Sequence, residues 1–207
     1  MNLGRPNPDY GNITQYSGQG DSYYNGLTGS VQHRARWAMA RVSYTLSKAI
    51  DNTGNAFFSS PQNNFNIRDD RALSDNDQRH RITVSGEISA KGFQLSPIFT
   101  YSTAYPFNIV TGGQTIQTTA ARLPGAGRNT GVGFNYTSLD LRLSRRVRVT
   151  ERVTAEVLAE SFNTLNRTNL QFPNNTFGPG PTPLPTFGQP TAAADPRQIQ
   201  FGLRFSF

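Results

Sequence analysis

Four aspartates between residues 69 and 77 form the densest group of side chains able to hold a hard cation. Asp69, Asp70, Asp75 and Asp77 offer carboxylate oxygens, which calcium and magnesium prefer. Their spacing lacks the Asp-x-Asp-x-Asp-Gly order of a calcium-binding loop. We therefore interpret these residues as solvated loop charges and predict no metal site.

The remaining polar motifs do not predict catalysis. Gly125-Ala-Gly127 lacks the third glycine of a phosphate-binding fingerprint, and it neither follows a buried strand nor opens a helix. Ser30 and Ser85 lie in no Gly-x-Ser-x-Gly elbow. Cysteine is absent, which excludes thiolate chemistry, and His33 and His80 are the only two histidines. We expect no catalytic residue, no bound cofactor and no enzymatic activity.

The composition excludes a helical membrane protein. Hydrophobic residues make up 35% of the 207 residues, and the mean hydropathy is −0.53. No apolar stretch approaches the ~20 residues that a membrane-spanning helix requires. Residues 1–8 lack the apolar segment of a secretory signal, which predicts either a protein that is not exported or a piece of a longer exported one.

The net charge of +7 and the pI of about 10.1 suggest a nucleic-acid hypothesis, because Lys and Arg side chains drive affinity for phosphates. The arginines, however, are spread over expected strands and loops instead of forming one continuous stripe. We therefore predict no nucleic-acid partner. A soluble basic β-protein that binds nucleic acid is kept as a weaker alternative.

Period-two alternation of apolar and polar residues marks most of the chain outside its Gly- and Pro-rich segments. It is clearest in residues 198–207, where one face carries Ile199, Phe201, Leu203, Phe205 and Phe207. The same pattern recurs, with Arg145 and Ile98 as exceptions, in residues 23–33, 38–46, 82–89, 93–102 and 139–149. A strand whose two faces meet different surroundings produces this pattern, so the predicted fold class is all-β.

Residues 153–165 fit either a helix or a strand, and the pairing register favours the strand. A three-residue turn just before this segment would place Arg146 opposite Glu156 and Arg142 opposite Glu160. Opposite charges directly across an antiparallel pair contribute ~0.2–1 kcal/mol each. We therefore predict a hairpin that carries these four residues as a mainly structural charge ladder on its polar face.

The connections between the expected strands alternate in length. Short turns are expected at residues 33–36, 90–92 and 150–152. Long connections are expected at residues 51–78, 111–135 and 171–197. Long loops are uncommon in compact soluble domains, whereas an outer-membrane barrel has short periplasmic turns, long extracellular loops, an apolar outer face and a polar lumen. We therefore predict an antiparallel, up-and-down transmembrane β-barrel with the charge ladder facing the lumen.

Aromatic residues support the barrel over its alternative, a soluble β-sandwich. They gather near the expected strand ends, as Tyr23, Tyr44, Tyr101, Tyr105, Tyr136, Phe205 and Phe207. Membrane barrels carry aromatic girdles at both interfaces, whereas a sandwich would place such rings in its core.

A set of short motifs runs in order along nearly the whole chain. The longest is Asp195-Pro-Arg-Gln-Ile-Gln-Phe-Gly-Leu-Arg-Phe-Ser-Phe207. The others lie at residues 5–8, 22–27, 43–51, 73–80, 127–131, 139–145, 162–167 and 173–178. In this order they resemble motifs of TonB-dependent outer-membrane receptors. The resemblance is to the Oar-like group with a carboxypeptidase-regulatory-like N-terminal domain, which is common in acidobacteria.

The resemblance implies a C-terminal segment of about seven or eight strands from a barrel of roughly 22 strands around a plug. Residues 1–21 would form an extracellular loop or a partial strand, and residues 22–207 the strands and loops of the barrel. The segment would lie in the outer membrane of a Gram-negative bacterium. It would form wall and loops for energy-coupled import of an unidentified substrate.

The resemblance also implies partners. These are the lipid bilayer, the barrel assembly machinery, an unidentified imported ligand and, only through a missing N-terminal part, TonB. In this family the terminal aromatic residue and its alternating strand are the assembly signal, which corresponds here to Phe201, Leu203, Phe205 and Phe207. The long loops are the expected ligand contacts, because loops on a rigid scaffold carry specificity.

A complete eight-stranded barrel with a structural or adhesive role is the main alternative within the membrane. It would require a strand before Ser22 that pairs with residues 198–207. Residues 11–17 are a poor candidate, because they are few and alternate weakly.

Overall fold

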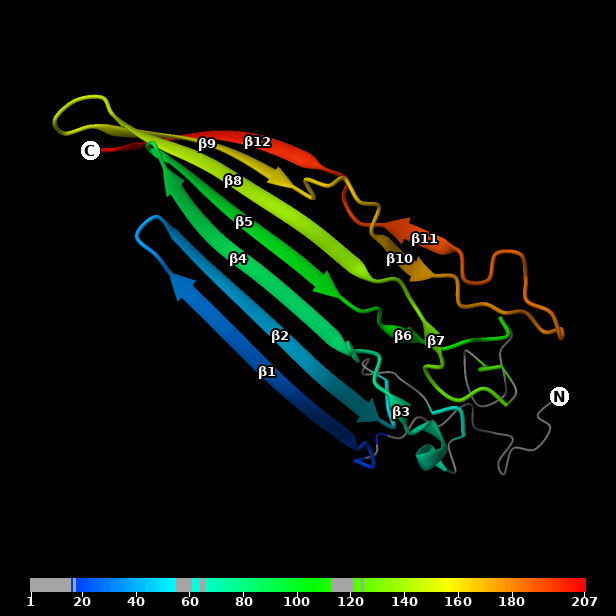
Figure 1. The fold of residues 1–207 in the computed structure, drawn as a ribbon. Coiled ribbons are helices and arrows are strands. Elements are labelled where there is room, and N and C mark those ends of the chain that lie inside the picture. The colour runs from blue at the N-terminus through cyan, green and yellow to red at the C-terminus, as the bar shows by residue number, and fades with distance from the viewer. Residues whose placement is uncertain (1–15, 17, 55–60, 64–65, 113–120, 124) are drawn as a thin grey trace.

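The computed structural model describes residues 16, 18–54, 61–63, 66–112, 121–123 and 125–207. Their main feature is one antiparallel sheet whose long strands follow each other in chain order (Figure 1). These strands are β1 (Ser22–Arg34), β2 (Ala38–Asp51), β4 (His80–Ala90), β5 (Phe93–Ser102), β8 (Tyr136–Arg148), β9 (Thr154–Phe162) and β12 (Gln198–Ser206). The predicted all-β, up-and-down arrangement is confirmed, and residues 153–165 contribute a strand.

Short elements lie in the long connections. The 3-10 helix η1 (Ile67–Asp70) precedes β3 (Ala72–Leu73), which pairs with the end of β2. Two small ribbons form from β6 (Pro106–Phe107) with β7 (Gly131–Val132), and from β10 (Leu170–Pro173) with β11 (Pro190–Ala193). Within the described residues, no helix is long and apolar enough to cross a membrane.

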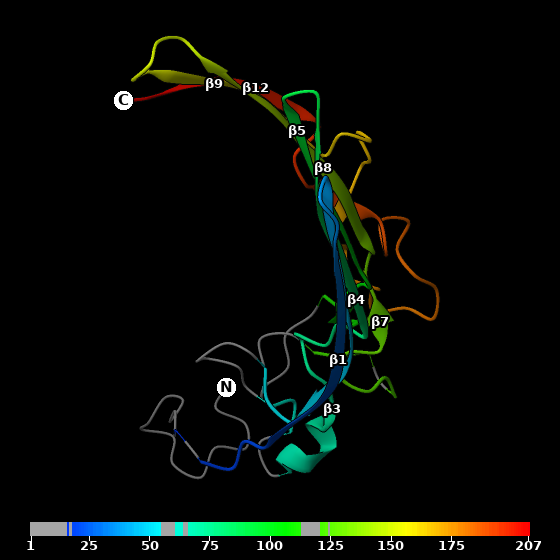
Figure 2. The ribbon, with the colours of Figure 1, turned by 60° about the vertical axis from the view of Figure 1, so that its left-hand side comes forward.

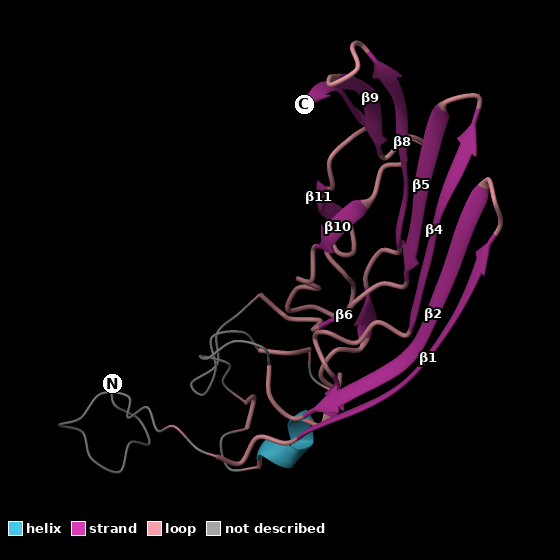
Figure 3. Cartoon of the chain, turned by 90° about the vertical axis from the view of Figure 1, so that its left-hand side faces the viewer, coloured by secondary structure: helices cyan, strands magenta, loops and turns pink. Residues whose placement is uncertain are grey.

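The sheet is a curved single layer, as the turned views show (Figures 2 and 3). The lengths of its long strands run from 9 residues, as in β12, to 14 residues, as in β2. A tilted strand needs about 9–11 residues to cross a bilayer, so these strands are long enough to span one. Each of the edge strands, β1 and β12, pairs with one neighbour only within the described part of the chain. The described sheet is therefore open.

Burial in this sheet is inverted relative to a soluble domain. Along β2 the apolar row is exposed, with Val42 at 44%, while its polar neighbours Ser43, Thr45 and Ser47 are less accessible. Among the described residues, the buried apolar side chains are only Val110, Ala121 and Ala155, and buried polar residues outnumber them. A sandwich would bury the apolar row against a second sheet, so the sandwich alternative is excluded.

The two ends of the sheet differ as predicted. Residues 35–37, 91–92 and 149–153 form the short turns at one end, and residues 52–79, 103–135 and 163–197 form the long connections at the other. The second and third long connections begin earlier than predicted. Phe162 ends β9 because the next residue, Asn163, has a φ of 46°, which takes the backbone out of the extended region.

The aromatic residues are at the strand ends with one exception. Tyr23 and Tyr136 lie at the loop end, and Phe205 and Phe207 at the short-turn end. The placement of Tyr44 is wrong, because it lies in the middle of β2. Its hydroxyl reaches the Nδ1 of His80 at 2.7 Å, at the first residue of β4.

Neighbouring residues on β4 provide a test of the two faces. Val84 lies opposite Val42 and Phe99 in the apolar row, whereas Thr83 lies opposite Ser43 and Thr100 in the polar row. We expect Val84→Lys to destabilise the sheet by about 2–4 kcal/mol, because a lysine on the lipid face near the midplane loses its hydration.

The matched variant is Thr83→Lys, which adds the same charge one residue away on the opposite face. It should cost less than ~1 kcal/mol, since that face is polar. Denaturant unfolding in lipid vesicles measures both values. Equal losses for the two variants would contradict the assignment of the faces.

Candidate functional site

The predicted hairpin register is present in β8 and β9. Arg146 lies opposite Glu156 and Arg142 opposite Glu160, with a nitrogen–oxygen distance of 3.6 Å in each pair. The turn closes through a hydrogen bond of 2.9 Å from the Val149 N–H to the Val153 carbonyl. These four residues therefore form two charged rows across β8 and β9 on the polar face, and their lumen-facing position remains a prediction.

Strand β12 extends the charge ladder beyond the predicted residues. Arg204 lies opposite Glu156, and Gln200 lies opposite Glu160 and donates a hydrogen bond to it. Glu156 is 6% exposed and has an arginine on either side in register. The predicted ladder did not include Arg204, because a long connection separates β12 from β9 and leaves their register open.

An apolar contact separates the two charged rows. Leu158 lies between Glu156 and Glu160 on the same face, opposite Gly202. A Cβ at Gly202 would lie 2.9 Å from the Leu158 Cδ1 atom. The glycine thus leaves space for Leu158 to lie against β12.

The two exceptions to the alternation have different surroundings. Arg145 lies in the apolar row, but its guanidinium is 4.7 Å from the ring centre of Phe93, its cross-strand partner beside the short turn. A long cationic side chain at the edge of the apolar band keeps its charge hydrated. Ile98 lies on the polar face between Ser85 and Asp140, and nothing in the described structure explains it.

The prediction that the acidic residues at the loop end are solvated holds for only some of them. Asp70 is 4% exposed, forms an ion pair with Arg122 and accepts a hydrogen bond from the Gln62 N–H at 3.0 Å. Asp77 is also buried and accepts a hydrogen bond of 2.7 Å from the Ala49 N–H. Only Asp69 fits the prediction in full. The interpretation is wrong for Asp70 and Asp77 because their partners come from elsewhere in the chain.

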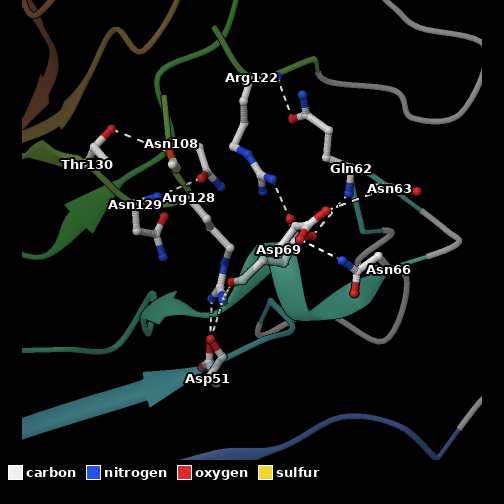
Figure 4. Close-up of polar contacts among 12 residues, drawn as sticks. Asp51, Gln62, Asn63, Asn66, Asp69, Asn108, Arg122, Arg128, Asn129 and Thr130 are labelled. Atoms are coloured by element: carbon white, nitrogen blue, oxygen red, sulfur yellow. Dashed lines mark hydrogen bonds and ion pairs between the residues drawn. The ribbon is translucent and has the colours of Figure 1, made fainter. Parts of the chain in front are cut away.

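Arg128 is the centre of this polar cluster (Figure 4). Its guanidinium forms ion pairs with Asp51 and, at 3.5 Å, with Asp75. It also donates hydrogen bonds to the backbone carbonyls of Asp51 at 3.0 Å and Asp70 at 3.2 Å. Arg128 comes from the second long connection and its partners from β2 and the first connection, so one side chain joins the two loops.

Asn129 reinforces this joint. Its backbone has a φ of 55°, and its side-chain amide donates to the Leu73 carbonyl at 2.8 Å and to Asp75 at 2.6 Å. The Asn129 N–H donates to the side chain of Asn108 at 2.9 Å. The glycine-containing segment at 125–127 is therefore a loop, as predicted, and it leads into the residues that lock the two connections together.

The third long connection is joined to the second through backbone contacts. The Val110 N–H donates to the Asn175 carbonyl at 2.9 Å, and the Phe177 N–H donates to the Val110 carbonyl at 2.8 Å. Asn169 is buried and exchanges hydrogen bonds of 2.9 Å with the backbone of Thr137. The loop end is consequently one connected assembly.

Among the described residues, no group of three or more His, Cys, Asp or Glu side chains is arranged to hold a metal ion. The buried carboxylates of Asp51 and Asp70 are directed at arginines. The motifs at 43–51, 73–80 and 127–131 contain Asp51, Asp75 and Arg128, but the sequence carried no signal that these motifs meet.

The predicted assembly signal lies on an edge strand. Phe201, Leu203 and Phe205 are exposed on the apolar face of β12, and Phe207 follows at the short-turn end. Their role in assembly remains a prediction.

A curved antiparallel wall that exposes its apolar face and shields its polar face is the architecture of an outer-membrane β-barrel. The chain matches the family described as outer membrane beta barrel domain over residues 1–125 and 118–200, and it belongs to this family. The protein is therefore located in the outer membrane, in contact with its lipids.

A solved transporter shares the fold. The outer membrane transporter YddB from Escherichia coli is similar with a TM-score of 0.60 and 12% sequence identity. The similarity covers 90% of this chain and 25% of the YddB chain, so the chain spans a minor part of that transporter's length. No protein of curated function matches the chain.

The charge ladder can be tested by reversing one charge. Glu156→Lys should destabilise the sheet by about 1–3 kcal/mol, because it replaces a buried carboxylate and places three cations in one row. Denaturant unfolding of the folded protein in detergent or lipid measures the change. The swapped variant Arg146→Glu with Glu156→Lys should recover part of the loss. Unchanged stability of Glu156→Lys would argue against the ladder.

The loop joint can be tested at Arg128. Arg128→Gln should weaken the contact between the first and second connections by about 3–5 kcal/mol, because it leaves the buried Asp51 carboxylate without its cation. Hydrogen exchange should show faster exchange in residues 66–80 and 125–135 and little change in β4 and β5. The control Arg68→Gln removes an exposed charge from η1 and should leave exchange unaltered. Equal protection in both variants would contradict a joint at Arg128.

Proposed function

We propose that this chain forms part of the barrel of a TonB-dependent transporter and imports a solute without catalysing a reaction. The observation that carries the proposal is the open sheet. Strands β1 and β12 each leave one edge unpaired within the described residues, and such an edge cannot lie in lipid, where every backbone group needs an internal partner. Strands of a larger barrel would cover both edges.

Two further observations support this assignment. The similarity to YddB extends over most of this chain but over 25% of that transporter, which suits a segment of a larger wall. The Oar-like motif at 127–131 also contains Arg128 and Asn129, which join two of the long connections.

The connected loops suit recognition of a ligand. The joint at Arg128 and the contacts of Val110 hold the three long connections against each other, and a rigid set of loops binds a ligand with less loss of conformational entropy. In this proposal the loops select the solute, the polar face lines its path, and TonB supplies energy through a part of the protein outside this chain. The barrel assembly machinery inserts the strands and reads Phe207.

A cysteine scan separates this proposal from a complete eight-stranded barrel. The chain has no cysteine, so pairs introduced into β1 and β12, such as Gly29→Cys with Leu203→Cys, report directly on proximity. A disulfide requires Cα atoms within about 7 Å. In the full-length protein in membranes we expect no disulfide at any register between β1 and β12. The control pair Leu143→Cys with Ala159→Cys, opposite each other in β8 and β9, should form one.

Transport is tested by solute uptake. Cells that carry the full-length protein should take up a solute that cells without it do not, and dissipating the proton gradient should abolish this uptake. A disulfide between β1 and β12 in the preceding cysteine scan would contradict the proposal and support the complete eight-stranded barrel. Uptake that persists without the gradient would indicate a passive channel.

A further inference from the structure

Two cations lie on the apolar face at the loop end of the sheet. Tyr23 is opposite Ile50, and Ile50 is opposite Leu73 on β3, so these three residues share one face. Lys48 and Arg71 are each two residues away along their chains and therefore share that face as well. This is the face that carries Leu27, Val31, Val42 and Leu46, and it is the lipid-facing side of an outer-membrane barrel.

One of the two cations lies over an aromatic ring, and the other lies nearby on the same face. The Arg71 guanidinium lies 4.9 Å from the ring centre of Tyr23, so its side chain reaches across β2 to β1. Lys48 is the diagonal neighbour of Tyr23 across the β1–β2 pair, and diagonal neighbours are about 7–8 Å apart.

These charges have no anionic partner among the described residues. No ion pair involves Lys48 or Arg71 within that part of the chain, and both residues are exposed. The carboxylates nearest to Lys48 and Arg71 in sequence, Asp51 and Asp70, are buried and paired with Arg128 and Arg122 respectively. A pair of exposed cations on a lipid-facing surface is therefore left for a ligand outside the described residues.

We propose that Tyr23, Lys48 and Arg71 bind the phosphate of a membrane lipid at the loop end of the barrel. Charge complementarity identifies this occupant. A cation on the lipid face is costly within the hydrocarbon, whereas it is stabilised beside an anionic headgroup. A tyrosine ring suits the same depth, since its ring meets acyl chains and its hydroxyl meets headgroups.

The apolar face at the short-turn end of the sheet differs from its loop end in the number of cations. There the apolar row contains Arg145 stacked on Phe93, a single cation on a single ring, which the edge of the bilayer accommodates by itself. Two unpaired cations at the loop end, on the face that carries Tyr23, instead match the charge of a phosphate monoester.

The test uses the full-length protein and native mass spectrometry. The protein is held in detergent with phosphatidylcholine and increasing amounts of lipid A, whose headgroup carries phosphate. We expect the protein to retain lipid A, and we expect Lys48→Gln with Arg71→Gln to weaken this retention at least tenfold. Lys48→Arg with Arg71→Lys should preserve retention, because both charges remain. Circular dichroism checks that each variant keeps its strands.

The matched control is Arg41→Gln with Arg81→Gln. These residues lie on β2 and β4 but on the polar face, opposite Ser85 and Thr45 respectively, so the control removes the same charge from the other side of the sheet. It should leave retention unchanged. Equal losses in both double variants would overturn the site as a nonspecific charge effect. If millimolar inorganic phosphate displaced lipid A, the site would bind a soluble anion and the lipid proposal would be overturned. If Lys48→Gln with Arg71→Gln left the retention of lipid A unchanged, the proposal would be refuted outright.

Discussion

The structure depends on one constraint: backbone N–H and C=O groups in hydrocarbon must find their partners within the protein. One layer of antiparallel strands meets this constraint, with lipid on one side and water on the other. The inverted burial follows directly. Val42 and Leu46 are exposed because lipid replaces the second layer of a soluble fold, while Ser138 and Ser144, in the polar row, are buried. A large apolar core is not needed, because the bilayer itself supplies the apolar surroundings.

The same constraint decides where charges lie. Glu156 and its arginine neighbours occupy the polar face, where water and opposite charges compensate each of them. The cations of the apolar face lie toward its ends, as Arg145 does beside the short turn and Lys48 near the loops. A charge at either end reaches headgroups and water, whereas a charge midway would cost about 2–4 kcal/mol. The positions of these few side chains therefore mark the limits of the membrane-spanning band.

The strands could be predicted from the sequence because a period of two is a local property. The pairing of Arg142 with Glu160 could also be predicted, since a short turn leaves few registers and the charges select one. The contacts of Arg204 and Arg128 could not. Arg128 and Asp51 are 77 residues apart, and no local pattern relates them. Asp70 was interpreted as solvated for the same reason, because its burial depends on Arg122 from another loop.

The loop joint has a physical logic that differs from that of the sheet. Loops beyond the bilayer have water on their surface and few apolar side chains to bury, so Val110 and Ala121 contribute little buried area. Buried ion pairs add modest stability, but removing one partner is costly. The two loops therefore separate only when Arg128 loses its ion pairs with Asp51 and with Asp75 at the same time. Because Val110 ties the second loop to the third, a ligand that displaced Arg128 would disturb a loop that both others contact.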